Sequence, residues 1–406
     1  MHDISSASCL SRRGLFGAMT TAGGLMLLRQ AVAQEKNPAA QVADSGASIR
    51  ITGLNTHRVQ HKVYVEILTN QKVTGWGEIS ALVPTAAEEL AKSLFELLDG
   101  ENPTRIEHLW QKLYRAHRDM RGGPFMCHTL AGIDMALWDI AGKLWGVPVH
   151  RLLGGPCRDR IRVYPTKKSE KVPPHGVYGH AVNPDEVERM AAAIKTARER
   201  VGPDGAVMFD AHCAVPPAAL IQLAAAIKAY DVLFLEEVAV PGNIEVFKRL
   251  KAAIDIPLAT GERDRAIWEF IPYLHERAID VLQPDVAHCG GITQMKKIAV
   301  LAEAYQVPLA PHCTTSPLGT TASLSVAASI PFLLIHETAP GNLKWGEQFM
   351  NRPWQVDDAT GYATLPDGPG LGIRIDIEKL AKVAADPNYK WSWPKVTLPD
   401  GSVADY

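Results

Sequence analysis

The pattern of hydrophobic and polar positions changes once along the chain, near residue 155. Between residues 51 and 78 apolar and polar side chains alternate, which is typical of half-buried β-strands, and a turn at 69–71 separates two such runs. Apolar residues then recur three and four apart, which is the period of a helix. The predicted helices cover residues 86–98, 106–116 and 128–144. We therefore expect a small α+β domain over residues 47–155.

From residue 161 onward, a short apolar run is followed by a helical stretch, and the pair repeats. The apolar runs cover residues 161–164, 206–210, 232–237, 257–262, 278–284, 307–312 and 332–337. Strands that alternate with helices at this interval predict parallel βαβ units. Because no glycine-rich dinucleotide-binding motif follows the first run, a closed barrel is favoured over a doubly wound sheet.

Polar residues stand at the ends of the runs after the first, or just beyond them. They are Asp210, Glu236, Glu262, Asp285, His312 and Glu337. In a parallel barrel the carboxyl ends of the strands share one rim, and that rim carries the active site in barrel enzymes. One polar residue at a strand end means little, since such ends meet water, but six in succession predict a functional site.

Composition narrows the kind of ligand that this site takes. The 406 residues are 47% hydrophobic and carry a formal net charge of −2. Such a balance shows neither the basic footprint of a nucleic-acid-binding protein nor a polybasic membrane surface. The cysteines are scattered and include no CxxC pair, so they predict neither a disulfide framework nor a zinc site. We expect a small-molecule ligand and no nucleic acid.

Asp210, Glu236 and Glu262, at three successive strand ends, predict a magnesium site. Carboxylates supply the hard oxygen ligands that Mg²⁺ prefers, and three of them would repel one another without a divalent cation. Glu237 competes with Glu236 for this role. Because neighbouring residues of a strand face opposite sides, only one of the two is expected to point into the barrel mouth, the space at the carboxyl ends of the strands.

Two histidines accompany these acids. His212 follows Asp210 by two residues and so faces the same side of the chain, where it can give a proton to a departing hydroxide. His312 ends the run after that of Asp285. An aspartate that binds one imidazole nitrogen fixes the tautomer and raises the basicity of the ring, which suits His312 as a base that removes a proton from carbon.

The first 33 residues have the three parts of a cleavable export signal. Arg12 and Arg13 give a charged start, residues 17–28 are apolar but too short to span a bilayer, and Ala31 and Ala33 have the A-x-A spacing of a cleavage site. Paired arginines are typical of the twin-arginine pathway. We expect cleavage after Ala33, a loose leader over residues 34–46, a periplasmic location and no stable membrane anchor.

Taken together, the motifs resemble those of the enolase superfamily, in its mandelate racemase and muconate lactonizing enzyme family, and are similar to galactonate-dehydratase-like acid-sugar dehydratases. The matching motifs are FDAH at 209–212, LEE at 235–237, TGER at 260–263, QPD at 283–285, GGIT at 290–293, APHC at 310–313 and GIDMALWDI at 132–140. The resemblance implies an α/β fold with a modified (β/α)7β TIM-type barrel over residues 156–345. An N-terminal α+β capping domain over 47–155 covers it, and the segment 346–406 returns to the cap.

The resemblance also implies a chemistry, the removal of water from a sugar acid such as galactonate to give a 2-keto-3-deoxy acid. The implied magnesium ligands are Asp210, Glu236 and Glu262. The bound cation holds the substrate carboxylate, and His312, oriented by Asp285, removes the α-proton to leave an enediolate that the cation stabilises.

Other residues complete the implied site. His212 corresponds to the acid that expels the β-hydroxyl, and Glu337 to the group that hydrogen-bonds the enediolate oxygen. The candidates for substrate contacts are Glu237, Lys167, Lys168 and Arg121. A homo-oligomer is also expected.

One segment departs from the pattern of the family. Only residues 165–182 separate the first run from the next predicted helix, where a βα unit of about 30 residues is usual. Either the barrel lacks one helix, with 176–181 as a poor second strand, or the segment is a loop over the mouth. No lysine pair for a second base is assigned on that strand, which disfavours racemisation by two bases.

Two other functions remain as alternatives. A racemase or epimerase of the same superfamily would act on a 2-hydroxy or sugar acid, and a non-catalytic periplasmic protein would only bind a sugar acid. His212 favours the dehydratase over the racemase, because elimination needs an acid near the metal. The three intact ligands and both histidines disfavour the binding protein.

Overall fold

The computed structural model describes residues 45–80, 83–119, 121–174, 182–386, 397–398 and 400–403. The predicted export signal and nearly all of the predicted leader lie outside these residues. The residues from Ile49 onward form one unit, which contains both the α+β region and the barrel. Before it, α2 (Ser45–Ser48) belongs to a separate unit.

The α+β region has the elements that its hydrophobic pattern predicts. Its strands β1 (Ile51–Val59), β2 (Lys62–Thr69) and β3 (Gly75–Ser80) form an antiparallel sheet in that order. The helices that follow are α3 (Pro84–Leu94), η2 (Phe95–Leu97), α4 (Ile106–Ala116), α5 (Pro124–Trp145) and α6 (Val149–Leu152). The predicted meander of strands and the three predicted helices are confirmed.

Helix α5 packs directly on strand β3, and two glycines make this possible. A Cβ atom added to Gly77 would lie 1.7 Å from the carbonyl oxygen of Gly132, so a larger residue would force the two backbones apart. The helix begins at Pro124 and is closed by Gly146, whose φ of 70° is left-handed. The GIDMALWDI motif is therefore a contact surface of α5.

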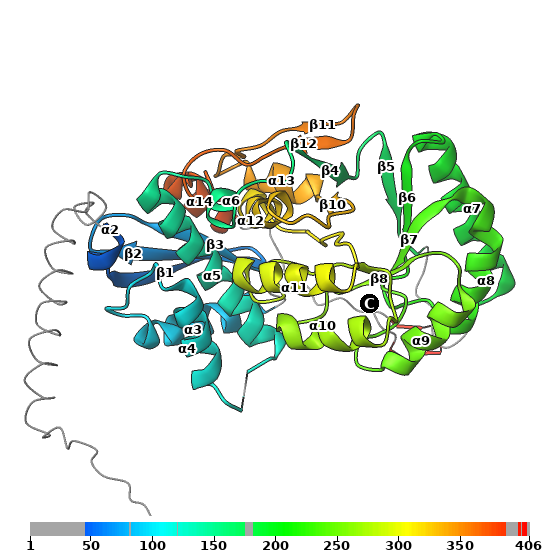
Figure 1. The fold of residues 1–406 in the computed structure, drawn as a ribbon, viewed down its shortest axis with the longest axis horizontal. Coiled ribbons are helices and arrows are strands. Elements are labelled where there is room, and N and C mark those ends of the chain that lie inside the picture. Colours follow the sequence, from blue (N-terminus) through cyan, green and yellow to red (C-terminus); the bar gives the residue numbers. More distant parts are fainter. Residues whose placement is uncertain are drawn as a thin grey trace, which may run out of the picture. The chain divides into compact units, whose positions relative to one another are not determined.

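The barrel strands that pair with one another are parallel, as predicted, and Figure 1 shows where they lie. They are β4 (Arg160–Tyr164), β5 (Ser169–Val172), β6 (Ala206–Asp210), β7 (Val232–Glu236), β8 (Leu258–Thr260), β9 (Val281–Leu282) and β10 (His336–Glu337). Ladders join β5 to β9 in chain order, and β10 pairs with β4. Parallel bridges from Leu282 to Leu309 and from Leu309 to Leu333 connect these two sets. The α/β barrel fold is thus confirmed.

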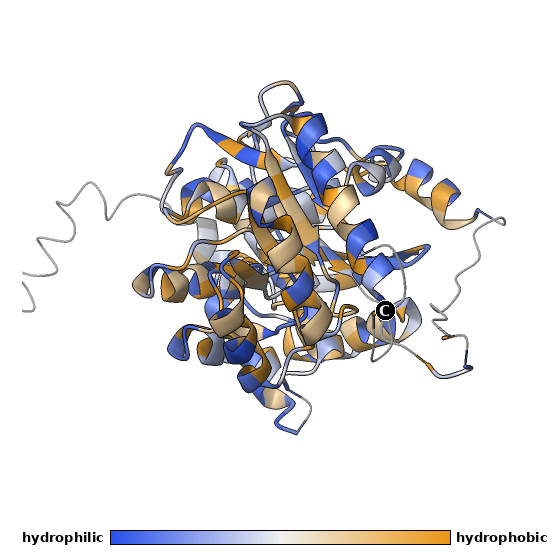
Figure 2. Cartoon of the chain, turned by 90° about the vertical axis from the view of Figure 1, so that its right-hand side faces the viewer, coloured by the Kyte–Doolittle hydropathy of each residue, from blue (hydrophilic) through white to orange (hydrophobic). Residues whose placement is uncertain are grey.

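Helices cover the barrel strands on the outside (Figure 1). They are α7 (Pro184–Val201), α8 (Pro217–Ile227), η3 (Lys228–Tyr230), α9 (Ile244–Ala253), α10 (Ala266–His275), α11 (Ile292–Ala304) and α12 (Pro317–Ala328). Figure 2 shows hydrophobic residues along the central strands. Val207, Leu235 and Leu258 face outward into the same apolar cluster as the helices.

The alternate strand residues fill the inside of the barrel. This inner cluster contains Tyr164, Met208, Phe234, Ala259, Val281, Ala310 and Ile335. Since side chains alternate along a strand, the residue two positions further on faces the same way. Asp210, Glu236, His312 and Glu337 therefore stand one layer above Met208, Phe234, Ala310 and Ile335.

The barrel lacks a helix between its first two strands. Residues 165–168 alone connect β4 with β5, and they form a turn closed by Thr166 and Ser169. The alternative of a barrel short by one helix is confirmed, but the second strand is Ser169–Val172. The expected strand at 176–181 lies outside the described residues. The hydrophobic pattern missed β5 because it has only four residues and just one large apolar side chain, Val172.

The C-terminal segment contacts both parts of the unit. Its elements are α13 (Pro340–Gly346), β11 (Val356–Asp357), β12 (Tyr362–Thr364) and α14 (Ile377–Ala384). β12 pairs with β4 of the barrel, whereas α14 packs on β1. Leu371 also donates its backbone N–H to Asp139 of α5 at 2.8 Å.

Two further findings concern the whole described chain. None of its helices is both long and apolar enough to cross a membrane. The cysteines that the structure describes, at positions 127, 157, 213, 289 and 313, are all free thiols.

Candidate active site

The six predicted strand-end residues lie together at the barrel mouth. One lysine and one of the six, a histidine, contact the five acids. Lys171 Nζ lies 2.6 Å from Glu337, 2.9 Å from Glu236 and 3.6 Å from Asp210. His312 contacts the remaining two acids, Glu262 and Asp285. The expectation that the rim gathers these side chains is confirmed.

Lys171 is the main residue of the site that the sequence analysis missed. It stands near the carboxyl end of β5, and its side chain is 19% exposed. Burial alone would lower the pKa of Lys171, but the carboxylates of Glu236 and Glu337 outweigh it and hold the pKa well above its usual value. The surrounding carboxylates therefore favour the charged form of Lys171. Recognition of β5 as a strand would have found it.

His312 and Asp285 form the predicted pair. His312 Nδ1 donates to Asp285 Oδ2 at 2.6 Å, which leaves Nε2 directed at Glu262, 3.5 Å away, and at Glu337, 3.8 Å away. Burial would lower the pKa of His312, but Glu262 and Glu337 raise it well above the usual value. The hydrogen bond to Asp285 fixes the ring so that Nε2 is the nitrogen presented to the mouth.

His212 and Glu237 form a second group around Glu262. Ligand atoms of His212, Glu237 and Glu262 lie within 4.8 Å of one another. Burial lowers the pKa of His212, and the Arg263 cation lowers it further, while Glu237 opposes the shift. Arg263 donates to both carboxylate oxygens of Glu237 and has Nη2 3.4 Å from His212 Nε2.

The expectation that only one of Glu236 and Glu237 reaches the mouth is wrong. Strand β7 ends at Glu236, and Glu237 has a left-handed backbone with a φ of 48°. The alternation of side chains therefore stops at this residue. Glu236 binds Lys171 while Glu237 turns towards Arg263 and His212, so both carboxylates face the site. Arg263 was also missed as a site residue, although it follows Glu262 in the TGER motif.

Asp210, Glu236 and Glu262 are buried acids with too little positive charge around them. Burial, above all, raises the pKa of each of them to about 7. Lys171 opposes the shift for Asp210 and Glu236, and His312 opposes it for Glu262. Among the described residues, the Oε2 atom of Glu236 has no hydrogen-bond partner. A divalent cation would supply the missing charge and a partner for that oxygen.

The distances alone mark two other groups as possible metal sites. Asp285, His288 and His312 form one, and His212, Glu237 and Glu262 form the other. The trio Asp210, Glu236 and Glu262 does not itself form such a group in this structure. It stays the predicted metal site because residues of the two groups already have partners. Asp285 is bonded to His312, and both oxygens of Glu237 accept from Arg263. Asp210 and Glu236 instead share the ammonium of Lys171, which a cation can replace. The carboxylate cluster thus fits a divalent metal.

The structure does not bring Lys167, Lys168 or Arg121 to this cluster. The two lysines precede β5, at the opposite end of the strand from Lys171, and both are exposed. Lys167 Nζ lies 3.9 Å from Asp358, in the turn between β11 and β12. Arg121 is exposed between α4 and α5, where its backbone N–H donates to His117.

Comparisons with known proteins agree with this fold. Residues 41–154 match the family model of the mandelate racemase / muconate lactonizing enzyme N-terminal domain, and residues 168–380 match that of the enolase C-terminal domain-like family. The chain is 35% identical to a D-galactonate dehydratase of Variovorax paradoxus over 384 residues, which cover 88% of this chain and 100% of that protein. For a D-galactonate dehydratase of Ralstonia pickettii the identity is 34% over 389 residues, with the same coverage.

Solved structures are similar as well. A crystal structure of an enolase from Agrobacterium radiobacter, with bound Na and L-malate, has a TM-score of 0.80 and 30% identity, and the match covers 88% of this chain and 100% of that one. A member of the enolase superfamily from Salmonella Typhimurium has a TM-score of 0.77 and 27% identity, with 82% and 98% covered.

Proposed function

The chain belongs to the mandelate racemase / muconate lactonizing enzyme family of the enolase superfamily, and from this we propose that it is a dehydratase of a sugar acid, such as the aldonate galactonate. The observation that carries the proposal is that two histidines, His312 and His212, both lie close to Glu262. His312 Nε2 lies 3.5 Å from Glu262, and His212 belongs to the group within 4.8 Å of it. Elimination of water needs both a base and an acid within reach of one bound substrate.

His312 is the proposed base. With its Nδ1 held by Asp285, Nε2 accepts the proton from the carbon next to the substrate carboxylate. Glu262 and Glu337 raise the pKa of His312, which favours the charged ring. His312 becomes a base when the charge of Glu262 is compensated, so the base and the proposed cation site depend on each other.

His212 is the proposed acid. Its Nε2 lies 3.8 Å from Glu237 and 3.4 Å from Arg263, which orient the ring at the mouth. Loss of the α-proton leaves an enediolate, which expels the β-hydroxyl as His212 gives it a proton, so that water departs. The resulting enol tautomerises to a 2-keto-3-deoxy acid. His312 then releases its proton to solvent and His212 takes one up, so both histidines return to their starting states.

Magnesium is the proposed metal, with Asp210, Glu236 and Glu262 as its ligands. A divalent cation bound there offsets the charge of these acids and of the substrate carboxylate. The three carboxylates have raised pKa values, and Glu236 Oε2 has no partner among the described residues, so this chain is suited to such a cation.

Lys171 takes the substrate contact that was expected of Lys167 and Lys168. Its ammonium is the one lysine cation that the described structure holds at the mouth, within 2.6 Å of Glu337. Glu337 Oε1 accepts from Lys171 and Oε2 accepts from the backbone of Cys313, so both oxygens already act as acceptors. We therefore assign the hydrogen bond to the substrate oxygen to Lys171, with Glu337 as the residue that positions it.

A racemase or epimerase is the second candidate, and Lys171 is the observation that favours it. Glu337 bridges Lys171 and His312, with its oxygens 2.6 Å and 3.8 Å away, so two potential bases share one mouth. The raised pKa of Lys171 argues against this role, since a base must be able to lose its proton near the working pH.

A library of aldonic and aldaric acids distinguishes the functions. The full chain is incubated with Mg²⁺ and each acid in D₂O, and products are followed by NMR. A dehydratase gives a 2-keto-3-deoxy acid, whereas a racemase returns the epimeric acid with deuterium at the α-carbon. Binding of an acid without either product would support the non-catalytic protein instead.

Export to the periplasm is proposed on the sequence alone. Residues 1–33 have the parts of a twin-arginine signal, and N-terminal sequencing of the protein from the periplasmic fraction is expected to begin at Gln34. Lysines substituted for Arg12 and Arg13 should retain the protein inside the cell. A mature protein that still carries the arginine pair would contradict the proposal. The homo-oligomer stays a prediction that gel filtration tests.

A further inference from the structure

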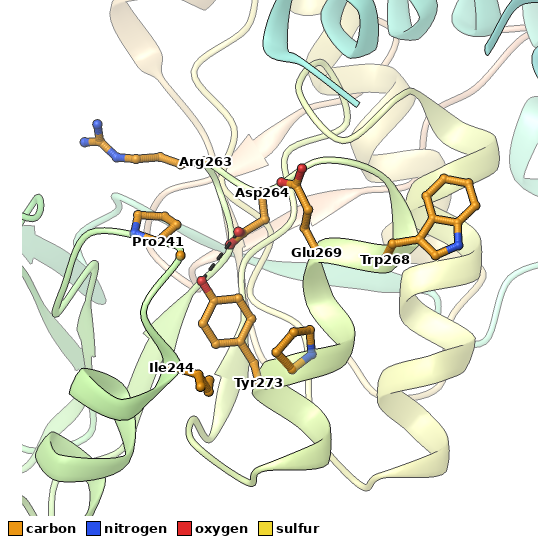
Figure 3. A pocket seen from close by; sticks show the side chains of 9 residues that line it. Pro241, Ile244, Arg263, Asp264, Trp268, Glu269 and Tyr273 are labelled. Carbon is orange, nitrogen blue, oxygen red and sulfur yellow. Dashed lines mark hydrogen bonds between the residues drawn. The ribbon is translucent and has the colours of Figure 1, made fainter. Parts of the chain in front are cut away.

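A second cavity lies beside the site, between the loop after β7 and helix α10. Its volume is about 500 Å³, within the range of pockets that hold small molecules. Pro241 and Ile244 line one wall, and Asp264, Trp268 and Tyr273 line others (Figure 3). None of these residues has a role in the proposed dehydration.

The cavity contains a buried carboxyl group with a free acceptor. Asp264 is 4% exposed, and its Oδ1 accepts from the hydroxyl of Tyr273 at 3.4 Å, a contact drawn in Figure 3. Its Oδ2 has no partner among the described residues. A buried oxygen without a hydrogen bond is costly, and a ligand that donates one would remove this cost.

Trp268 lines the same cavity with a flat apolar ring, which lies beyond Glu269 from Asp264 in Figure 3. Its ring stacks on Tyr114 with centroids 5.2 Å apart, and Tyr114 stacks in turn on Trp110 at 4.8 Å. The stack fixes the indole, yet Trp268 remains 47% exposed. A rigid aromatic face next to a hydrogen-bonding group is the usual means of holding a ring that has both CH and OH groups.

The charges disfavour an acid at this position. Arg263 also lines the cavity, but its guanidinium is bonded to both oxygens of Glu237. The other charged lining residues are Asp264 and Glu269, and Glu269 accepts from the backbone of Arg265 at 2.6 Å. A carboxylate ligand would meet two acids and no unengaged arginine within this lining.

We propose that this cavity is a second binding site, for a neutral sugar ring that stacks on Trp268 and donates a hydroxyl to Asp264 Oδ2. It is separate from the carboxylate cluster, where the proposed cation and the sugar acid would bind. The connection between the two is Arg263, which lines the cavity and contacts both Glu237 and His212.

Ligand-observed NMR of the full chain with Mg²⁺ tests the proposal, with methyl galactoside and methyl glucoside as neutral probes. Three comparison ligands are included. Cyclohexanol lacks the array of hydroxyl groups, cyclohexylamine carries a positive charge, and galactonate carries a negative charge. We expect saturation transfer to at least one glycoside. Trp268→Ala and Asp264→Asn should each weaken its binding by about tenfold or more.

Three further variants test whether the binding is specific to this cavity. Trp145→Ala removes an indole of the same 47% exposure elsewhere, and should leave glycoside binding unchanged. Tyr273→Phe removes only the hydroxyl that faces Asp264, and should alter binding even if Asp264→Asn does not fold. His312→Asn should bind the glycosides as the unaltered protein does.

Three results would overturn the proposal. One is the absence of glycoside binding at millimolar concentration. Another is binding that Trp268→Ala leaves intact, which would place the sugar elsewhere. The third is a preference for cyclohexylamine or galactonate over the glycosides, which would assign the cavity to a charged ligand.

Discussion

Two sets of buried acids, one between the cap and the barrel and one at the barrel mouth, differ in the partners that surround them. In the first set, Glu78 pairs with Lys62 at 2.8 Å and accepts from the backbone N–H groups of Ser316 and Gly319. Asp134 and Asp139 belong to this set too. Each oxygen of these three acids has a partner, and several partners are backbone groups from a distant part of the chain.

Asp134 illustrates how these contacts join the two parts. It lies in α5 of the cap, and its Oδ2 accepts from the backbone N–H of Thr293, at the start of α11 in the barrel, at 3.0 Å. A Cβ at Gly291 would lie 2.4 Å from the same oxygen, so glycine is required there for the close approach. Backbone donors cannot move away, so this acid fixes the position of α5 on the barrel.

Asp210 and Glu236 of the mouth share a side-chain cation instead. Both contact the ammonium of Lys171, and Asp210 Oδ1 also accepts from the backbone N–H of His212 at 2.8 Å. Glu236 Oε2 lacks a partner among the described residues. A raised pKa does not distinguish the two sets, because burial raises the pKa of Asp134 to about 7, as it does for Glu236. The identity of the partners is what separates an acid that holds the fold from an acid prepared to hold a cation.

The largest expected effect concerns the base of the mouth. His312→Asn should lower dehydration by about 10⁴-fold, the upper end for general acid–base catalysis, and should stop exchange of the α-proton with D₂O. His212→Asn should cripple dehydration but leave the exchange, because it removes only the acid. Product formation and deuterium incorporation are measured by NMR. Equal loss of exchange in both variants would refute the division of roles.

A stability measurement then compares one acid from each set. Glu78→Gln leaves Lys62 buried without its counter-charge, and should lower the free energy of unfolding by about 3 to 5 kcal/mol. Glu236→Gln is the matched control at the mouth. It removes one of several carboxylates that repel one another and leaves Lys171 paired with Glu337, so the metal-free protein should be as stable as the unaltered chain, or more so. Urea denaturation followed by circular dichroism provides both values, and similar losses would remove the distinction.

Magnesium should stabilise the protein only by binding at the barrel mouth. At a concentration 100 times the dissociation constant, binding to the folded state adds about 2.7 kcal/mol to the free energy of unfolding. EDTA should reverse the gain. Glu262→Gln should reduce it by weakening the metal site, whereas Gln at Glu107, an exposed acid of α4, should retain it. A thermal shift that survives in Glu262→Gln would place the cation elsewhere.

The pH dependence of stability follows from the raised pKa values. Asp210, Glu236 and Glu262 have pKa values of about 7 in the folded protein and about 4 in the unfolded chain. The folded state therefore binds more protons between these values, so the stability of the metal-free protein should fall as the pH rises from about 4 to 7. Thermal unfolding across this range measures it.

Saturating Mg²⁺ separates the two sets in the same experiment. The cation should remove the part of the pH dependence that comes from the mouth and leave the part from Asp134, whose pKa is also about 7. A pH profile that Mg²⁺ does not alter would contradict the assignment of the trio as ligands.

The sequence was sufficient for the parts that follow from local periodicity. The alternation of Met208 with Asp210, and of Phe234 with Glu236, indicates which side chains face the barrel axis. It failed where a strand stops, since Glu237 leaves the strand with a positive φ and turns back to the site. It also failed for Lys171, because a strand of four residues has no detectable period.

Contacts between distant segments could not be predicted from local sequence patterns, for a different reason. Glu78 and Ser316 are 238 positions apart, and Asp134 and Thr293 are 159 apart. Nothing in the spacing of either segment reveals its partner. The GIDMALWDI motif was recognised as a family signature, but its physical basis, an acid that binds the start of α11, required the folded structure.

The smallest expected effect belongs to the lysines outside both sets. Lys167→Ala and Lys168→Ala change exposed side chains, so stability should shift by no more than about 0.5 kcal/mol and activity by less than about twofold. Lys171→Met is the matched comparison, because it removes the cation that Glu236 and Glu337 share at the mouth. Steady-state kinetics on the aldonate found by the library screen compare the activities of the three variants. If Lys167→Ala loses as much activity as Lys171→Met, the lysine that contacts the substrate would belong to the turn before β5 and not to the strand itself.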